Sequence, residues 1–217
     1  MPTFSAVHLE FIAFAALWTI GLSAIAFVGG GIVGFAVALA RISHIRALRY
    51  AAIVYIQVVQ GTPLLILLFL IYFGIAIVGF NEVPAIIAAG IGLTIYSSGF
   101  LAEIWRGCIE SVPKTQWEAA ECLALTPWQR MTRVILPQAL RIATAPTVGF
   151  LVQIVKNTSL ASVVGFVELA QAGKLINNSI FEPFTVFMVV AAFYFAICFP
   201  LSTWSRSLER KLNVGRR

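Results

Sequence analysis

Long apolar stretches with almost no charge are the feature that most restricts how this chain can fold. Five of them are about 20 residues long, the length that an α-helix needs to cross the hydrocarbon core of a bilayer. They lie at about residues 17–40, 62–80, 85–105, 143–165 and 184–204. Only 11% of the residues are charged, whereas a soluble domain carries about 25%. The sequence therefore predicts an all-α, polytopic membrane protein in which residues 1–217 form a single transmembrane domain.

A proline divides one of the apolar runs. Residues 50–80 are too long for a single upright helix, and Thr62 and Pro63 lie within them. A hydroxyl residue followed by proline is a typical helix start, which predicts Thr62 as the N-cap and Pro63 at the first helical position. The alternative is a proline kink within one long, tilted helix.

The first apolar stretch is rich in glycine. Small residues in a membrane helix allow the backbone of a second helix to approach closely. We therefore expect helix packing, rather than chemistry, from Gly21, Gly29, Gly30, Gly31 and Gly34.

Basic residues divide unevenly between the segments that connect the apolar stretches. Of the 15 lysines and arginines, 3 follow the first stretch, 5 follow the third and 5 follow the fifth. Because Lys and Arg accumulate on the cytoplasmic side of membrane proteins, these segments and the C-terminus are predicted to be cytoplasmic and the N-terminus outside. The net charge of +6 is then a topology signal in a protein of the lipid bilayer, and no nucleic-acid partner is expected.

A polar segment at residues 115–137, "TQWEAAECLALTPWQRMTRVILP", interrupts the apolar sequence. Thr115 with Glu118 three residues later fits a capping box, in which two side chains satisfy the free amides of a helix start. Thr126 with Gln129 three residues later repeats the pattern, with a proline directly after the threonine.

These two patterns predict two short helices, at about 115–124 and 127–136, the second interrupted by Pro137. Both helices have an apolar side. The segment is therefore either a docking element for a partner protein or an amphipathic loop at the membrane surface.

The same segment resembles the EAA loop of ABC importer permeases, whose pattern begins Glu-Ala-Ala and ends Leu-Pro. Val134 and Ala124 depart from that pattern, since the family has isoleucine and glycine there. The glycine suits a left-handed helix C-terminus, where alanine costs about 1 kcal/mol. The candidate ATPase-coupling residues are Glu118, Ala119, Ala120, Ala124, Leu136 and Pro137.

Three further motifs narrow the resemblance to the permeases for polar amino acids. They are "QGTPLLILLFLIYFG" at 60–74, "SSGFLAEIWRGCIESVPKTQWEAA" at 97–120 and "KNTSLAS" at 156–162. The first is similar to that branch's Arg-Gly-Thr-Pro signature, with Gln60 in place of the arginine. Together with the EAA loop they extend over nearly the whole chain.

This resemblance implies a type I ABC importer permease fold with five transmembrane helices and a cytoplasmic coupling loop at about residues 108–138. The chain would be the transmembrane subunit of an ATP-driven importer in the bacterial cytoplasmic (inner) membrane. Its implied partners are two ATPase subunits, a second permease that is a copy or a paralogue, and an external solute-binding protein that delivers a small polar amino acid.

Chemistry by the chain itself is not expected. It holds no Gly-x-x-x-x-Gly-Lys-Ser/Thr loop, so hydrolysis of ATP is assigned to a partner subunit, and no cofactor or metal is expected. Glu118 is then either a helix cap or an ion-pair partner for the surface of the ATPase. An intramembrane enzyme is disfavoured because no His-Glu-x-x-His or Gly-x-Ser-x-Gly motif is present.

A cation within the fourth apolar stretch marks the candidate substrate site, because charges inside a span are costly and usually functional. Lys156 lies midway along that stretch, and Ser97 and Ser98 lie at about the same depth in the antiparallel third stretch. Lys156 would meet the carboxylate of an amino acid. The alternative is a structural role, in which Lys156 pairs with Glu103 or holds helix ends together. The candidate substrate-binding residues are Ser97, Ser98, Glu103, Lys156, Asn157, Thr158 and Ser159.

Two remaining expectations concern Glu103 and selectivity. Glu103 and Arg106 lie three residues apart, which predicts a local ion pair on one helix face. Asn157 is uncharged and gives no bias toward cationic substrates.

The rival function is a secondary transporter or channel, which often shows an inverted repeat. No repeat is visible here, and five spans do not divide into equal halves.

Overall fold

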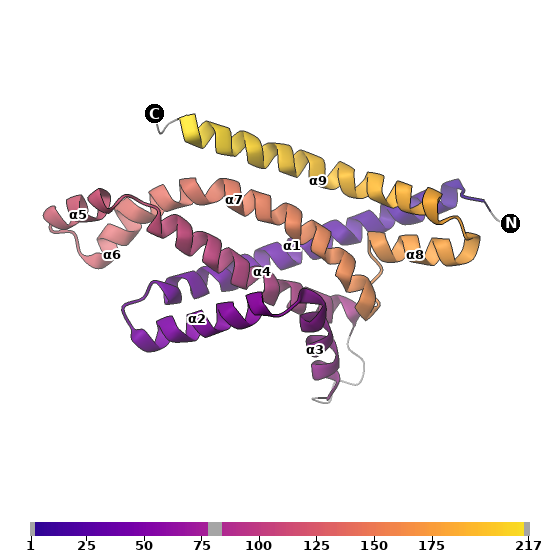
Figure 1. Ribbon diagram of the computed structural model, residues 1–217, viewed down its shortest axis with the longest axis horizontal. Helices are drawn as coiled ribbons and strands as arrows, with labels where there is room; N and C mark the ends of the chain where they lie inside the picture. Colours follow the sequence, from indigo (N-terminus) through magenta and orange to yellow (C-terminus); the bar gives the residue numbers. More distant parts are fainter. Residues whose placement is uncertain (1–2, 78–83, 215–217) are drawn as a thin grey trace.

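The computed structural model describes residues 3–77 and 84–214, and the described part is an elongated bundle of helices (Figure 1). Its α-helices are α1 (Ala6–Arg41), α2 (Arg46–Gly61), α3 (Leu64–Ile77), α4 (Ala85–Glu110), α5 (Lys114–Cys122), α6 (Pro127–Gln129), α7 (Leu136–Asn157), α8 (Leu169–Ile180) and α9 (Pro183–Val214). A π-helix, η1 (Arg130–Ile135), and a 3₁₀-helix, η2 (Thr158–Val164), flank α7.

Four helical segments of the described chain are long and apolar enough to cross a membrane, and α2 with α3 makes a fifth if the bent pair is one span. All four begin earlier than predicted or end later. The first begins at Ala6 rather than residue 17, because residues 6–16 are also mostly apolar. The last three residues of the predicted 62–80 stretch lie outside the described residues.

Glycines bring α1 and α4 into backbone contact. A Cβ atom on Gly30 would lie 2.6 Å from Cβ of Ser97, and one on Gly34 would lie 2.8 Å from the carbonyl oxygen of Ser98. Neither distance is compatible with a side chain larger than hydrogen unless the helices separate. The predicted packing role is confirmed at these two positions.

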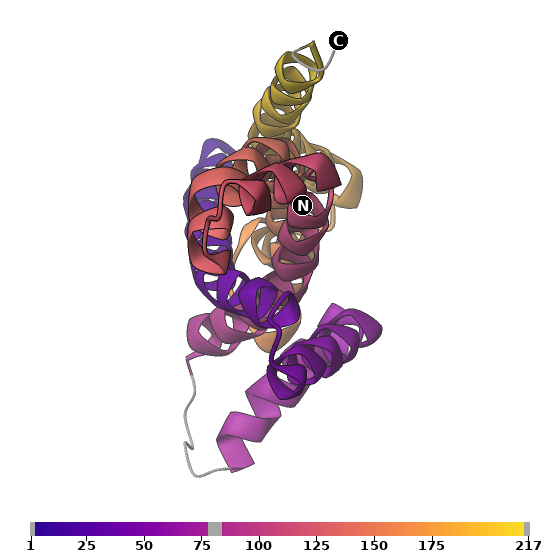
Figure 2. The same cartoon turned by 90° about the vertical axis from the view of Figure 1, so that its left-hand side faces the viewer.

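The division at Thr62 and Pro63 is confirmed, because α2 and α3 meet at an angle of 105°. Thr62 takes an extended conformation, as residues before proline prefer. It is the C-cap of α2, and its hydroxyl donates to the carbonyl of Val58 at 2.8 Å. The predicted N-cap role of Thr62 is therefore wrong, and α3 begins at Leu64 rather than at Pro63. Figure 2 shows that α3 leaves the bundle after this break.

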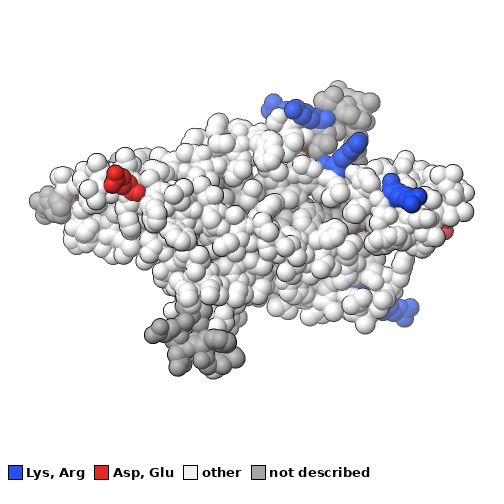
Figure 3. Space-filling view, turned by 180° about the vertical axis from the view of Figure 1, so that it is seen from behind, with Lys and Arg blue, Asp and Glu red and all other residues white. Residues whose placement is uncertain are grey.

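Charges gather at one end of the bundle. On the face in Figure 3, Lys and Arg lie toward the end that holds α5 and the C-terminal part of α9. The long apolar surface between the ends carries almost no charge on this face. This distribution matches a protein whose middle is solvated by lipid.

Candidate functional site

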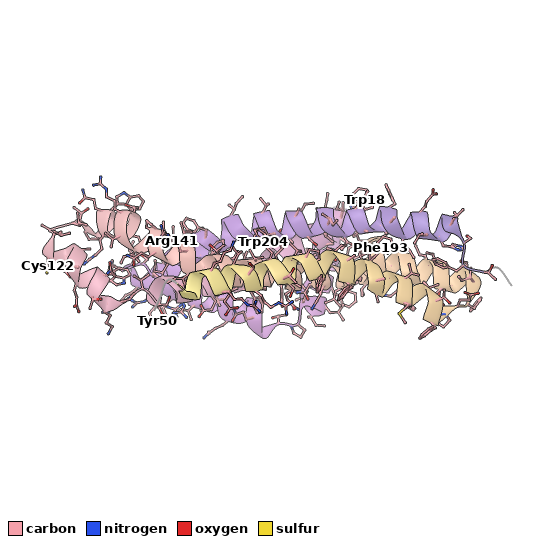
Figure 4. The ribbon with its side chains drawn as sticks, turned by 90° about the horizontal axis from the view of Figure 1, so that it is seen from above. Trp18, Tyr50, Cys122, Arg141, Phe193 and Trp204 are labelled. Carbon is pink, nitrogen blue, oxygen red and sulfur yellow. The ribbon has the colours of Figure 1, made fainter. Side chains whose placement is uncertain are left out.

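The polar segment forms a helical hairpin, α5 followed by α6 and η1, at one end of the bundle (Figure 1). Figure 4 places Cys122, the last residue of α5, at the extreme of that end. α5 begins at Lys114 with Pro113 as its N-cap and has no side-chain cap bond. The predicted capping box of Thr115 and Glu118 is therefore wrong, because the helix has already begun one residue before Thr115.

The second helix start is confirmed. The Thr126 hydroxyl accepts from the amide of Gln129 at 3.3 Å, and the Gln129 side chain accepts from the amide of Thr126 at 3.0 Å. Pro127 occupies the first turn, where its missing N–H costs nothing. This end of the hairpin is therefore fixed by its own sequence.

The turn between the two helices uses the conformation that the family glycine would favour. Ala124 has φ 54°, in the left-handed region. Its amide donates to the carbonyl of Glu121 at 2.9 Å, and the amide of Leu125 donates to the carbonyl of Ala120 at 3.3 Å. These two bonds form a Schellman motif, the usual left-handed helix ending. Ala124 therefore forms the same turn as a glycine would, but with the backbone strain of a left-handed conformation in a residue that has a Cβ atom.

Pro137 does not interrupt the second helix, which contradicts the prediction. Residues 127–164 form one uninterrupted helical segment. A proline in a helix interior lacks a donor and clashes with the carbonyl four residues earlier. Here that carbonyl belongs to Arg133, inside the π-helix η1, whose wider turns relieve such a clash. We call residues 127–164 the α7 rod.

One side of the hairpin packs against the bundle. Trp117, Met131 and Val134 contact a buried cluster at the ends of α4 and α7 that includes Ile109 and Ile135. Ala120 is buried as well. The hairpin is therefore held to the bundle as a packed element.

The other side of the hairpin is exposed. Leu123 and Trp128 expose 74% and 75% of their surface, and Glu118 and Ala119 are exposed beside them. Arg130 pairs with Glu121 across the hairpin at 3.1 Å. Apolar side chains this exposed, rimmed by charges, are typical of a docking surface.

The last two candidate coupling residues lie at the base of the hairpin. Leu136 is half-buried and Pro137 is exposed. Leu136 also lines an apolar pocket of about 110 Å³ between α1, α4 and α7, together with Phe35 and Trp105. Because its lining is wholly apolar, this pocket does not suit an amino acid.

Glu103 forms the predicted local pair. Its carboxylate accepts from the guanidinium of Arg106, which also pairs with Glu110. Lys156 is exposed in the last turn of α7 and has no ion-pair partner among the described residues. The alternative pair of Lys156 with Glu103 is therefore not what the structure shows.

The predicted layer of serines beside Lys156 is not assembled. Ser97 is fully buried against Gly30 of α1. Ser98 is fully buried too, and its hydroxyl lies 2.5 Å from that of Tyr55 on α2. Both serines thus face α1 and α2, whereas Lys156 is exposed at the end of α7.

The polar residues that follow Lys156 close the end of α7. The hydroxyls of Thr158 and Ser159 donate to carbonyls of the last helical turn, each at 2.7 Å. The Asn157 side chain accepts from Gln153 at 3.2 Å, and its amide nitrogen is buried without a partner in the described chain.

Gln153 and Asn157 lie on a stripe of α7 that begins with Phe150. Phe150 stacks on Phe100 of α4 with ring centroids 5.6 Å apart, and Phe100 contacts Tyr96. Gln153 is exposed and the rest of this stripe is half-buried. We call these five residues, three on α7 and two on α4, the open face, because none of them is fully buried in the described chain. It combines amide groups with aromatic rings, which suits a polar organic solute.

Sequence reasoning missed Glu168, the one fully buried acid among the described residues. It caps α8: its two carboxylate oxygens accept from the amides of Ala170 and Gln171, each at 2.9 Å. The Tyr194 hydroxyl donates to the same carboxylate at 2.6 Å. Glu168 lies outside the candidate spans, and burial raises the pKa of its carboxyl against the lowering effect of these bonds. Its position directly before the apolar, periodic sequence of α8 was the available signal.

Comparison with known proteins identifies the family. The sequence matches the family described as binding-protein-dependent transport system inner membrane component over residues 30–214. The chain belongs to this family. The permease is 39% identical to the probable amino-acid ABC transporter permease protein YckA of Bacillus subtilis, over 89% of this chain and 85% of that protein. It is 36% identical to the probable glutamine ABC transporter permease protein GlnM of Bacillus subtilis, over 89% of each.

Solved structures agree with this assignment. A crystal structure of an amino acid ABC transporter with histidines matches with a TM-score of 0.89 at 30% identity, over 97% of this chain and 100% of that one. An inward-facing MetNI methionine ABC transporter matches in fold, with a TM-score of 0.78 at 21% identity over 96% and 99% of the two chains. The permease is thus a multi-pass inner membrane subunit of an ABC importer.

Proposed function

We propose that this permease carries a polar amino acid across the inner membrane as one half of a paired pathway. An external solute-binding protein delivers the amino acid, and two ATPase subunits hydrolyse the ATP. The second permease subunit is a copy or a paralogue of this chain. Relatives named as amino-acid and glutamine permeases support the substrate class.

One observation carries the mechanism: the exposed hairpin is continuous with the α7 rod. The rod contains 38 residues, which corresponds to roughly 55 Å at 1.5 Å per residue. It begins at the capped turn of Thr126 and passes Asn157 near its far end. A rigid-body movement of the hairpin is therefore transmitted to the residues around Asn157.

The exposed side of the hairpin is the proposed coupling surface for an ATPase subunit. Leu123 and Trp128 supply apolar anchors and Glu118 supplies a charge. Of the two sequence-based roles for Glu118, an ion pair with the ATPase is the one that remains, since Glu118 caps no helix in the described chain. Ala120 and Leu136 support this surface from the bundle side, and Ala124 sets the angle between the two helices.

The substrate is proposed to pass along the open face. Gln153 is exposed there and its side chain bonds to that of Asn157, and Lys156, exposed one position before Asn157, supplies a positive charge for the carboxylate. The hydroxyls of Thr158 and Ser159 stabilise the end of α7, which carries Lys156 and Asn157. Ser97 and Ser98 do not contact the substrate but fix the position of α4 against α1 and α2. Glu103, whose charge is paired with that of Arg106, lies farther along the path.

The membrane arrangement that goes with this proposal has five spans, with α2 and α3 forming one broken span. The hairpin and the C-terminus are cytoplasmic, and the N-terminus and α8 face outward. The gathering of basic side chains at the hairpin end supports this orientation.

Reversing the charge of Glu118 tests the coupling role. Glu118→Lys should leave membrane insertion unchanged and should lower ATP-driven uptake, because a repulsive contact replaces an attractive one at the ATPase surface. Glu209→Lys is the matched control, since Glu209 is an exposed acid at the same end of the bundle but on α9 rather than on the hairpin. Measurements of uptake and of ATP hydrolysis by the assembled complex decide the question. If Glu118→Lys transports at the parent rate, the hairpin does not dock through this residue.

A further inference from the structure

The carboxylate of Glu168 is saturated with donors although it is completely buried. It accepts from two backbone amides of α8 and from the Tyr194 hydroxyl of α9. A buried charge is costly even when it is well paired. A residue of this kind in an apolar bundle therefore calls for an explanation beyond stability.

Two further elements, α1 and η2, are joined to α8 at the same place. The amide of Leu169 donates to the Thr19 hydroxyl of α1 at 3.1 Å. The ammonium of Lys174 donates to the Ser162 hydroxyl of η2 at 3.0 Å. We call Glu168, Tyr194, Thr19, Lys174 and Ser162 the Glu168 cluster. It ties α8 to α1, to α9 and to the last turn of the α7 rod.

Apolar packing already holds α8 in place without this cluster. Leu169, Ile176 and Ile180 are buried in one apolar cluster with residues of α1 and α9. A Cβ atom on Gly173 would lie 2.8 Å from Val190, so α8 and α9 are in close contact. Hydrophobic contacts are not directional, whereas the hydrogen bonds of the cluster fix one arrangement of α8 relative to its neighbours.

The cluster also meets the α7 rod at its far end. Ser162 belongs to η2, the final part of the rod, and its hydroxyl accepts from the ammonium of Lys174 on α8. A movement of the hairpin therefore arrives at the cluster through η2. A movement of α8 reaches the hairpin by the same route in the opposite direction.

We propose that Glu168 is a positioning residue that keeps α8 and the α7 rod in the resting arrangement until the loaded binding protein acts on the outer end. This inference depends on the proposed function, because it assigns a regulatory role within the coupled transport cycle. The Glu168 cluster restrains the rod, and through the rod it restrains ATP hydrolysis by the partner subunits. Docking of the loaded binding protein releases the restraint.

The decisive variant is Tyr194→Phe, which removes the α9 link and leaves the cap of α8 intact. The matched control is Tyr50→Phe, because Tyr50 is 62% exposed on α2 and lies outside the cluster. The complete complex is reconstituted with its ATPase subunits, and ATP hydrolysis is measured with and without the cognate binding protein loaded with L-glutamine. Hydrolysis without the binding protein should rise about tenfold in Tyr194→Phe, which corresponds to about 1.4 kcal/mol, the scale expected for one hydrogen bond to a charged group.

Stimulation by the loaded binding protein should fall in the same proportion, and Tyr50→Phe should match the parent. A purely structural cluster would instead lower the yield of complex and leave the stimulation ratio unchanged, and that result overturns the inference. If Tyr194→Phe fails to assemble, Lys174→Met carries the same expectation, because Lys174 is exposed and only its link to Ser162 is lost. A parent complex without any stimulation contradicts the proposed function itself, so the two failures are distinguishable.

Discussion

Replacement of Trp128 gives the sharpest quantitative test of the coupling surface. Trp128 is 75% exposed at the start of the α7 rod. Aromatic side chains bury about 150–250 Å² when they are fully enclosed, so docking can remove about 150 Å² of Trp128 from water. At about 25 cal/mol per Å² this amounts to about 4 kcal/mol. Ordering of the side chain and imperfect enclosure reduce the value to about 2 kcal/mol.

A loss of about 2 kcal/mol weakens binding about 30-fold, which is the range of an interface hot spot. Trp128→Ala should therefore raise the Kd of the purified ATPase subunit for the permease in lipid nanodiscs by about that factor. Trp204→Ala is the control, since Trp204 is 54% exposed on α9 and lies away from the hairpin (Figure 4). Equal affinities for Trp128→Ala and the parent would refute the assignment of the docking surface.

Three shorter predictions concern the turn, the cation and the orientation. Ala124→Gly should stabilise the permease by about 1 kcal/mol, because glycine takes φ 54° without strain; a lower Tm in detergent would contradict this. Lys156→Met should reach the membrane at least as well as the parent while ATP-driven uptake falls, and a reduced membrane yield would reveal a structural counter-ion instead. A cysteine at Asn178, exposed on α8, should react with an impermeant reagent outside intact cells and one at Thr126 should not; the reverse pattern would invert the proposed topology.

Local rules predicted part of the local structure, although the capping box of Thr115 and Glu118 and the N-cap role of Thr62 were wrong. The capping box of Thr126 and Gln129 and the ion pair of Glu103 and Arg106 are both present, because each depends only on residues three positions apart. The break at Pro63 is present as well, because it depends only on the proline and the residue before it. The prediction for Pro137 was wrong because the π-helix η1 avoids the steric clash between the proline ring and the preceding turn. A π-helix depends on how the whole rod packs, and no short sequence pattern predicts it.

The candidate site was harder to predict because it depends on which way each helix is turned. Depth along a span follows from residue counts, but the side that a residue faces does not. Ser97 and Ser98 therefore face α1 and α2 rather than Lys156. Glu168 escaped notice because the sequence alone does not show that Tyr194, 26 positions away, donates to it.

Uptake by the reconstituted complex tests the central claim most directly. The permease, its partner permease and the ATPase subunits are placed in liposomes, and entry of labelled amino acids is followed with the binding protein present. The account predicts uptake of a polar amino acid that requires both ATP on the side of the hairpin and the loaded binding protein. Uptake by the permease alone, driven by an ion gradient without ATPase subunits, would contradict it and would identify a secondary transporter.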